Sequence, residues 1–159
     1  MSGFSRTVIP HTILQRVIPD TAAYDELCAY TLTLADAHFI HQHVVDAFAV
    51  QCADEHTKPI AVAFGLIGLY LKVERRFSGR QVQRAHMTMA RRKRTWPSFT
   101  LPRDRGAITA RTVLAAPAGR AREGAIDAWC VSVWDAFRAN HAAVAALVAE
   151  YGIAPERTT

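Results

Sequence analysis

One stretch of the sequence limits the fold more than any other. The run from Pro59 to Leu71 has almost no polar side chains and carries two glycines, Gly65 and Gly68, three positions apart. A helix that is apolar on most sides is buried, and this run falls well short of the roughly 20 apolar residues that cross a bilayer. Each glycine costs a helix about 1 kcal/mol, and close packing usually compensates. The run therefore predicts a buried central helix with a neighbouring helix against its glycines.

The rest of the chain predicts further helices around this one. The fold class is all-α: a single compact helical bundle of about five or six helices, with an irregular N-terminal arm where two Ile-Pro pairs favour extended backbone. The domain is expected over residues 21–152, with the arm at 1–20 and a C-terminal tail at 153–159. The other predicted helices are 21–34, 35–53 with Asp36 as its cap, 79–95, 109–114 and 122–151.

Charge is distributed unevenly along the chain. Residues 72–122 hold 14 Lys and Arg against 2 Asp and Glu, a net charge of +12, while both flanks are acidic and the whole chain carries +5. No helix-turn-helix, zinc-finger or RNP-type motif frames the basic part. We therefore favour pairing with the acidic flanks, or a plain solvated face, over binding of nucleic acid or of another anionic ligand.

Several classes of protein are excluded or disfavoured by missing motifs. The three cysteines Cys28, Cys52 and Cys130 form no CxxC pair, which argues against a zinc ribbon or a disulfide scaffold. The sequence has no GxSxG and no glycine-rich phosphate loop. The first residues lack the continuous apolar core of a signal peptide. We expect a cytoplasmic protein with reduced thiols that does not enter a membrane.

Several segments together resemble a known family. They are VDAFAVQ at 45–51, GLYLKVE at 68–74, Trp96-Pro97, and Trp129 with Trp134. In this order they are similar to a bacterial family of unknown function with a histidine shortly before a VDA[YF]xxQ segment. The likeness covers about residues 24–150. It implies a compact helical domain and no particular activity.

Histidines and a carboxylate near the second predicted helix are candidates for a metal site. His38 and His41 are three positions apart and would share one helix face, and His43 and Asp46 form a second such pair. Imidazole and carboxylate suit a divalent metal ion such as zinc. The candidate metal ligands are His38, His41 and Asp46; the alternative interpretation is surface histidines plus one inward histidine with a structural hydrogen bond.

A broader hypothesis is a polar site between helices that binds a small molecule or metal ion, lined by His41, Asp46, Gln51 and His141. An inward Asp46 must be paired or protonated, because an isolated buried charge is costly. Such a carboxyl either locks two helices together or acts as a base or ligand with a shifted pKa.

Two further hypotheses concern surfaces. The basic helix of residues 75–94 is the basis of an alternative function, a non-catalytic module that binds an acidic protein or nucleic acid. Its candidate anion-binding residues are Arg91, Arg92, Lys93 and Arg94. The other hypothesis is a self-associating protein, in which the alanine-rich last helix supplies the face of a homodimer.

Overall fold

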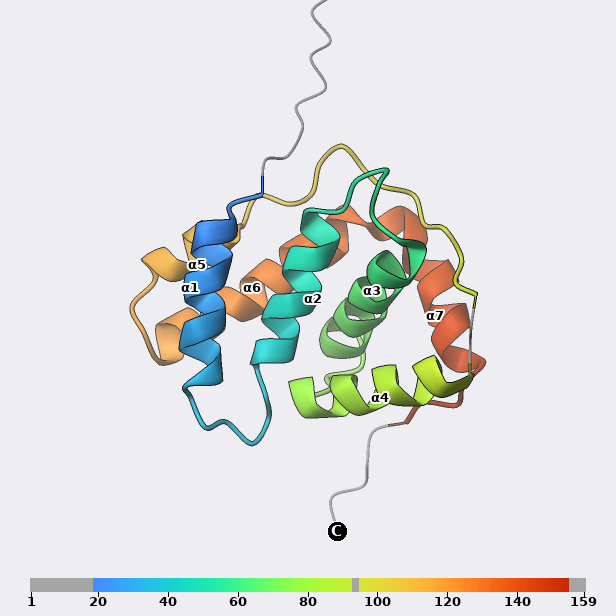
Figure 1. Cartoon of the computed structure of the whole chain (residues 1–159), viewed down its shortest axis with the longest axis horizontal. Helices are drawn as coiled ribbons and strands as arrows, with labels where there is room; N and C mark the ends of the chain where they lie inside the picture. The colour runs from blue at the N-terminus through green and yellow to red at the C-terminus, as the bar shows by residue number, and fades with distance from the viewer. Residues whose placement is uncertain (1–18, 93–94, 155–159) are drawn as a thin grey trace, which may run out of the picture.

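The computed structural model describes residues 19–92 and 95–154. Most of the predicted N-terminal arm, part of the predicted tail, and Lys93 and Arg94 lie outside the described residues. Within them the chain is all-helical with no strand, as predicted. The helices are α1 (Thr21–Leu32), α2 (His41–Gln51), α3 (Pro59–Val73), α4 (Gly79–Arg92), α5 (Ala110–Ala115), α6 (Arg120–Ala136) and α7 (His141–Ala149) (Figure 1).

The apolar run forms the central helix α3, as its composition predicts. It begins with Pro59 in the first turn, where proline is tolerated, and it contacts α2, α4, α6 and α7. Its glycines meet α2: a β-carbon added to Gly65 would lie 2.3 Å from Val50 Cγ2. One added to Gly68 would lie 1.9 Å from Asp46 Oδ2. The predicted close packing is therefore between α3 and α2.

The second helix starts later than its sequence predicts. The sequence predicts a helix over residues 35–53 with Asp36 as its cap. In the structure, α2 begins only at His41. The Asp36 carboxylate instead accepts the N–H groups of His38 (2.8 Å) and Ile40 (2.9 Å). Phe39 between them has a φ of 54°, a left-handed conformation that no helix continues through. His38 therefore lies in a turn, one element before His41.

The last predicted helix is divided in two. α6 ends at Ala136, and a 3-10 turn at Arg138–Asn140 leads into α7. The turn directs the buried Asn140 side chain at the backbone of Thr100, accepting its N–H (2.9 Å) and donating to its carbonyl (2.8 Å). This two-way amide contact binds the turn between α6 and α7 to the backbone of Thr100.

A loop of residues 95–109 crosses one end of the molecule between α4 and α5 (Figure 1). Arg105 fastens it to α2 by donating to the carbonyl of Ala53 (2.8 Å), just beyond the C-terminal end of that helix. The guanidinium also lies over the Phe137 ring. A cation at a helix C-terminus is favourable because unpaired carbonyls gather there.

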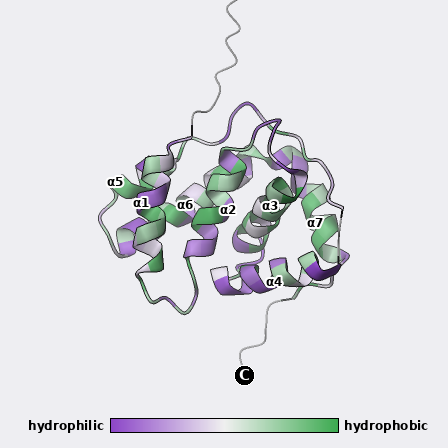
Figure 2. Ribbon diagram, viewed as in Figure 1, coloured by the Kyte–Doolittle hydropathy of each residue, from purple (hydrophilic) through white to green (hydrophobic). Residues whose placement is uncertain are grey.

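Hydropathy separates the helices. Figure 2 shows hydrophilic residues along much of α4, whereas the α7 ribbon is mostly hydrophobic. The buried residues of α4 are Gly79, Val82, Ala85, His86 and Met89, which lie on the side facing the core. Among the described helices, none combines the length and the apolar character that crossing a bilayer requires.

Candidate functional site

The four residues predicted to line one polar site make separate contacts. His41 Nδ1 lies 2.9 Å from the hydroxyl of Thr31, on α1. His141 stacks on the Trp134 ring with centroids 3.8 Å apart, and its Nε2 lies 2.8 Å from the Trp134 carbonyl oxygen. These two histidines serve different helix contacts, one between α1 and α2 and the other between α6 and α7.

Gln51 is a buried connector. Its Nε2 donates to the carbonyl of Ile108 (2.7 Å), and its Oε1 accepts from Trp129 Nε1 (3.0 Å). A second donation reaches the carbonyl of Arg105 (3.2 Å). The amide thus joins α2, α6 and the 95–109 loop, and these contacts use both of its ends.

Asp46 is the most unusual of the four residues. Its side chain is buried against Gly68, and only one carboxyl oxygen has a partner: Oδ1 accepts from Gln42 Nε2 at 3.0 Å. Oδ2 has no partner within the described residues. Burial raises the pKa of this carboxyl well above its ordinary value, against the smaller opposing effect of the Gln42 hydrogen bond. Burial between the two helices therefore favours the neutral form of the Asp46 carboxyl.

The three predicted metal ligands also contact different parts of the fold. His38 lies in the turn before α2, His41 faces Thr31, and Asp46 faces Gly68. Across residues 19–92 and 95–154, no group of three or more His, Cys, Asp or Glu side chains converges in a way that could hold a metal ion.

The basic segment partly pairs with the acidic flanks. Lys72 Nζ lies 2.6 Å from Asp127 Oδ1, and Arg111 pairs with Asp20. Of the predicted anion-binding residues, Arg91 and Arg92 are exposed at the end of α4, and Arg92 lies over the ring of Tyr151 at 4.9 Å from its centroid.

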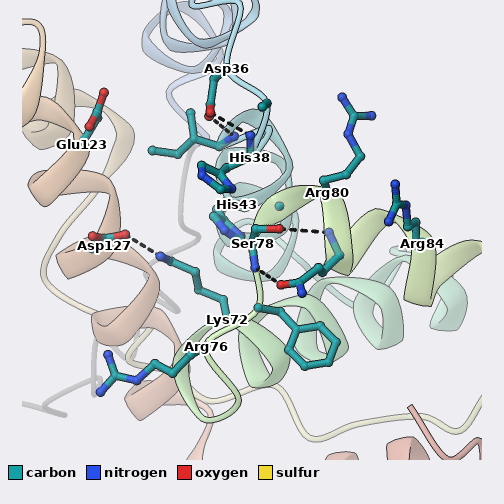
Figure 3. Close-up of a pocket in the computed structure, with 15 residues that line it drawn as sticks. Asp36, His38, His43, Lys72, Arg76, Ser78, Arg80, Arg84, Glu123 and Asp127 are labelled. Atoms are coloured by element: carbon teal, nitrogen blue, oxygen red, sulfur yellow. Dashed lines mark hydrogen bonds and ion pairs between the residues drawn. The ribbon is translucent and has the colours of Figure 1, made fainter. Parts of the chain in front are cut away.

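A pocket of about 700 Å³ lies at the opposite end of α4. We call it the interhelical pocket. It is bounded by the turn before α2, by α2, by the end of α3, by the start of α4 and by α6 (Figure 3). Its lining residues are Asp36, Ala37, His38, Ile40, His43, Lys72, Arg76, Phe77, Ser78, Gly79, Arg80, Gln81, Arg84, Glu123 and Asp127.

His43 is the buried polar side chain of this pocket. It is only 4% exposed, and its Nδ1 atom has no hydrogen-bond partner in the described part of the chain. Burial lowers its pKa to about 3, and the nearby Lys72 charge acts in the same direction. The imidazole is therefore neutral at physiological pH. A buried polar group with unused capacity at a pocket is a feature of ligand sites.

Acidic side chains of α6 and arginines of α4 lie on opposite walls of the interhelical pocket, and Arg76 lies on the α6 side, below Asp127. Figure 3 shows Glu123 and Asp127 on α6 at one side, and Arg80 and Arg84 on α4 at the other. The Lys72–Asp127 ion pair spans the lower part of the α6 side. Arg80 Nη1 donates to Gln83 Oε1 at 2.8 Å, and its guanidinium lies 4.6 Å from the centroid of the Phe39 ring.

The backbone around the pocket is strained. Among the described non-glycine residues, three have positive φ angles: Ala35 (46°), Phe39 (54°) and Arg76 (61°). All three belong to the two segments that border the pocket before α2 and after α3. Strained residues persist where the surrounding structure holds them, and they gather at functional sites.

The first turn of α4 is fixed in place by two kinds of contact. Ser78 and Gln81 cap it reciprocally: Ser78 Oγ accepts from Gln81 N (3.2 Å), and Gln81 Oε1 accepts from Ser78 N (2.8 Å). Arg80 N donates to the His38 carbonyl (2.8 Å). Gly79 packs so closely that an added β-carbon would lie 1.8 Å from Phe39 O. The positive end of the helix therefore adjoins the pocket.

No feature of the sequence predicts this pocket. His43 and Arg80 belong to a histidine cluster and a basic helix, and nothing in the sequence links the two. Lys72, Glu123 and Asp127 belong to no motif, because the pocket is built from three stretches that are far apart in the sequence, 36–43, 72–84 and 123–127. The local signal was the S-x-x-Q sequence at 78–81, which is typical of a capped helix start.

Comparison with known families gives one match. The model of a family described as "Family of unknown function (DUF5946)" matches residues 21–138. The chain belongs to this family. The match confirms the resemblance drawn from the sequence, and it extends from α1 into the turn before α7. No curated protein and no solved structure matches the chain. The family carries no assigned activity, so functional proposals rest on the pocket itself.

Proposed function

We propose that this protein binds a small molecule with an anionic group in the interhelical pocket. The observation that carries the proposal is the buried, unpartnered imidazole of His43 at a pocket whose α4 wall presents arginine side chains. The volume of the interhelical pocket lies in the range of about 300–1,000 Å³ that is typical of ligand sites. The anionic group is placed near Arg80, at the positive end of α4.

The chemistry of the pocket suits a hydrogen-bonded anion. His43 is neutral, so it contributes a hydrogen bond and no charge. An orphaned buried N–H is rarer in proteins than an orphaned acceptor, which favours the tautomer with the proton on Nε2. Nδ1 then remains an unpaired acceptor inside the protein, and Nε2 is the ring nitrogen that donates to the ligand. Ser78 Oγ accepts from Gln81 N, which leaves its own proton available as a second donor.

The test compares two arginines on one helix. Arg80 lines the pocket, whereas Arg91 is exposed near the other end of α4 and does not line it. Arg80→Gln and Arg91→Gln remove the same charge. We expect inorganic phosphate, titrated at constant ionic strength and followed by amide NMR shifts, to move signals of residues 78–81 and His43. Arg80→Gln should weaken binding several-fold and Arg91→Gln much less. Equal weakening by both variants would contradict a pocket-specific site.

Metal binding by His38, His41 and Asp46 remains a separate prediction. These residues contact different elements, so an ion shared by all three requires movement of the turn before α2. Metal analysis of the untagged protein tests it. Stoichiometric zinc that is lost in His41→Ala would support it, and metal-free protein whose melting temperature does not respond to zinc would refute it.

A second candidate function is an interaction module that uses α4. The observation in its favour is a line of exposed side chains at helical spacing, Arg80, Arg84, Met87 and Arg91, with Met87 51% exposed. Arginine beside an exposed apolar side chain suits an acidic protein surface. Polyglutamate binding that weakens equally in Arg80→Gln and Arg91→Gln would support this module. Binding to duplex DNA alone, with a steep salt dependence, would favour nucleic acid instead.

The proposal includes a cytoplasmic location and a homodimer. The three cysteines are free, which supports a reducing compartment such as the cytoplasm. The exposed residues of α7 include Ala142, Ala143 and Ala146, a face of small side chains that suits the predicted homodimer. Light scattering of the purified protein tests the dimer, and a monomer at high concentration would rule it out.

A further inference from the structure

The opposed charges of the interhelical pocket specify more than an anion. A ligand with only negative charge would face repulsion from the α6 wall, where Glu123 and Asp127 lie. Asp127 is already paired with Lys72 at 2.6 Å. Glu123 is exposed, and its carboxylate has no ion-pair partner among the described residues. Glu123 therefore places a carboxylate without an ion-pair partner across from the arginines of α4. Of the other lining charges, Asp36 accepts two backbone N–H groups, and Arg76 lies below Asp127 in Figure 3.

We propose that the ligand is a small zwitterion, with its anionic group at the α4 wall and an ammonium group at Glu123. This inference rests on the proposed function, because it names the class of ligand for the same pocket. The two charged ends would be separated by a short chain crossing the pocket. The ring of the buried Phe77 and the side chain of Ile40, both lining residues, provide apolar surface for that chain.

The geometry assigns the groups around the two ends. At the anionic end the donors are the Arg80 guanidinium, the Ser78 hydroxyl and the neutral His43 ring. At the ammonium end Glu123 is the acceptor. The Lys72–Asp127 pair closes the same wall without adding net charge. A charge at each end discriminates against ligands that carry one sign alone, because the unmatched wall then opposes binding.

The experiment uses matched ligands that differ in one group. Phosphoethanolamine and propyl phosphate have similar shapes, but only the first carries an ammonium group; 4-aminobutyrate and pentanoate form the corresponding carboxylate pair. Binding is measured by calorimetry to the full chain at fixed pH and ionic strength. We expect the ammonium member of whichever pair binds to be favoured about threefold or more, the range of an exposed ion pair. The pair that binds identifies the anionic group as phosphate or carboxylate.

The Glu123→Gln variant should change the affinities of the two kinds of ligand in opposite directions. It should weaken binding of the zwitterion about threefold, because an attraction is lost, and strengthen binding of the purely anionic ligand, because a repulsion is lost. Glu150→Gln, at the exposed end of α7, removes the same charge away from the pocket and should change neither. Equal binding within each pair, or equal effects of Glu123→Gln on both members, overturns the zwitterion. Absence of binding by all four ligands and by inorganic phosphate overturns the proposed function itself.

Discussion

The Oδ2 atom of Asp46 occupies the space that a side chain at Gly68 would need: a β-carbon there would lie 1.9 Å from this oxygen. The contact joins the VDAFAVQ segment of α2 to the GLYLKVE segment of α3. Two segments of the family resemblance are therefore directly packed on each other. The glycine is required by its neighbour, since its own backbone is ordinary helix.

Gly68→Ala should destabilise the protein by about 1–3 kcal/mol, as overpacking of a tight core does. Removing the opposing side chain should relieve the clash, so Asp46→Ala combined with Gly68→Ala should cost less than the sum of the two single changes. Urea unfolding of the four proteins measures this coupling. Purely additive costs would show that α2 and α3 separate without resistance at this point.

Asp46→Asn should raise stability at neutral and higher pH. The folded protein holds the Asp46 proton at pH values where the unfolded chain, with a carboxyl pKa near 3.9, has released it. Between the two pKa values the free energy of unfolding falls as pH rises, by about 1.4 kcal/mol for each unit of pKa difference. Asparagine removes this loss, and its oxygen still accepts from Gln42. The free energy of unfolding of the variant, relative to that of the native protein, should be higher at pH 8 than at pH 5.

Asp36 supplies a control of opposite sign. Its pKa is lowered, first by the N–H of Ile40 and also by that of His38. Its contribution to stability is present above the unfolded pKa and is lost as pH falls through the folded value. Asp36→Asn should therefore be less stable than the native protein at neutral pH, and the difference should shrink in acid. If both asparagine variants respond to pH alike, at least one of the two assigned pKa directions is wrong.

Gln51→Ala should destabilise the protein by about 2–4 kcal/mol, because the buried N–H of Trp129 and the carbonyl of Ile108 lose their partner. Gln83→Ala is the matched control. Its amide bonds the exposed Arg80 on the surface of α4, so the change should stay within about 0.5 kcal/mol. Thermal unfolding compares the two. A Gln51→Ala variant of native stability would return this residue to the list of ligand-binding candidates.

The cysteines should react slowly in the folded protein. Burial raises the pKa of Cys130 to about 12 and that of Cys52 to about 11, and the thiolate is the reactive form. Brief treatment with iodoacetamide followed by mass spectrometry should leave Cys130 unmodified, whereas the unfolded chain should take up label at all three positions. Rapid native labelling of Cys130 would show that the contact between α2 and α6 opens readily.

Local chemistry explains which parts of the fold the sequence reveals. The glycines of α3 predict a close helix contact, and Asp20 caps α1 by accepting from Ala23 N at 3.0 Å. The start of α2 is different, because Gly79 packs on the Phe39 carbonyl from a segment about forty positions away. A capping residue looks the same before a helix and before a turn, and only that distant contact decides between them.

The candidate site illustrates the same limit. His41 and His43 are equivalent as sequence letters, yet one meets Thr31 on α1 and the other lines the interhelical pocket. The two side chains are two positions apart on α2, so they point to nearly opposite sides of the helix, and which neighbours they meet depends on how distant segments pack there. Charge counting identifies the basic segment from the sequence. It gave no information about which cations border a pocket with acids opposite.

The amide contacts of Gln51 and Asn140 have a consequence for proteolysis. Both hold the 95–109 loop to helices at its backbone, and Arg105 has its guanidinium bound to the end of α2. Trypsin requires an arginine side chain in its specificity pocket and an extended backbone around it. The bond after Arg105 should therefore resist cleavage until the whole domain unfolds, although the sequence there contains proline, glycine and charge. A loop bound in this way opens only when the helices beneath it unfold.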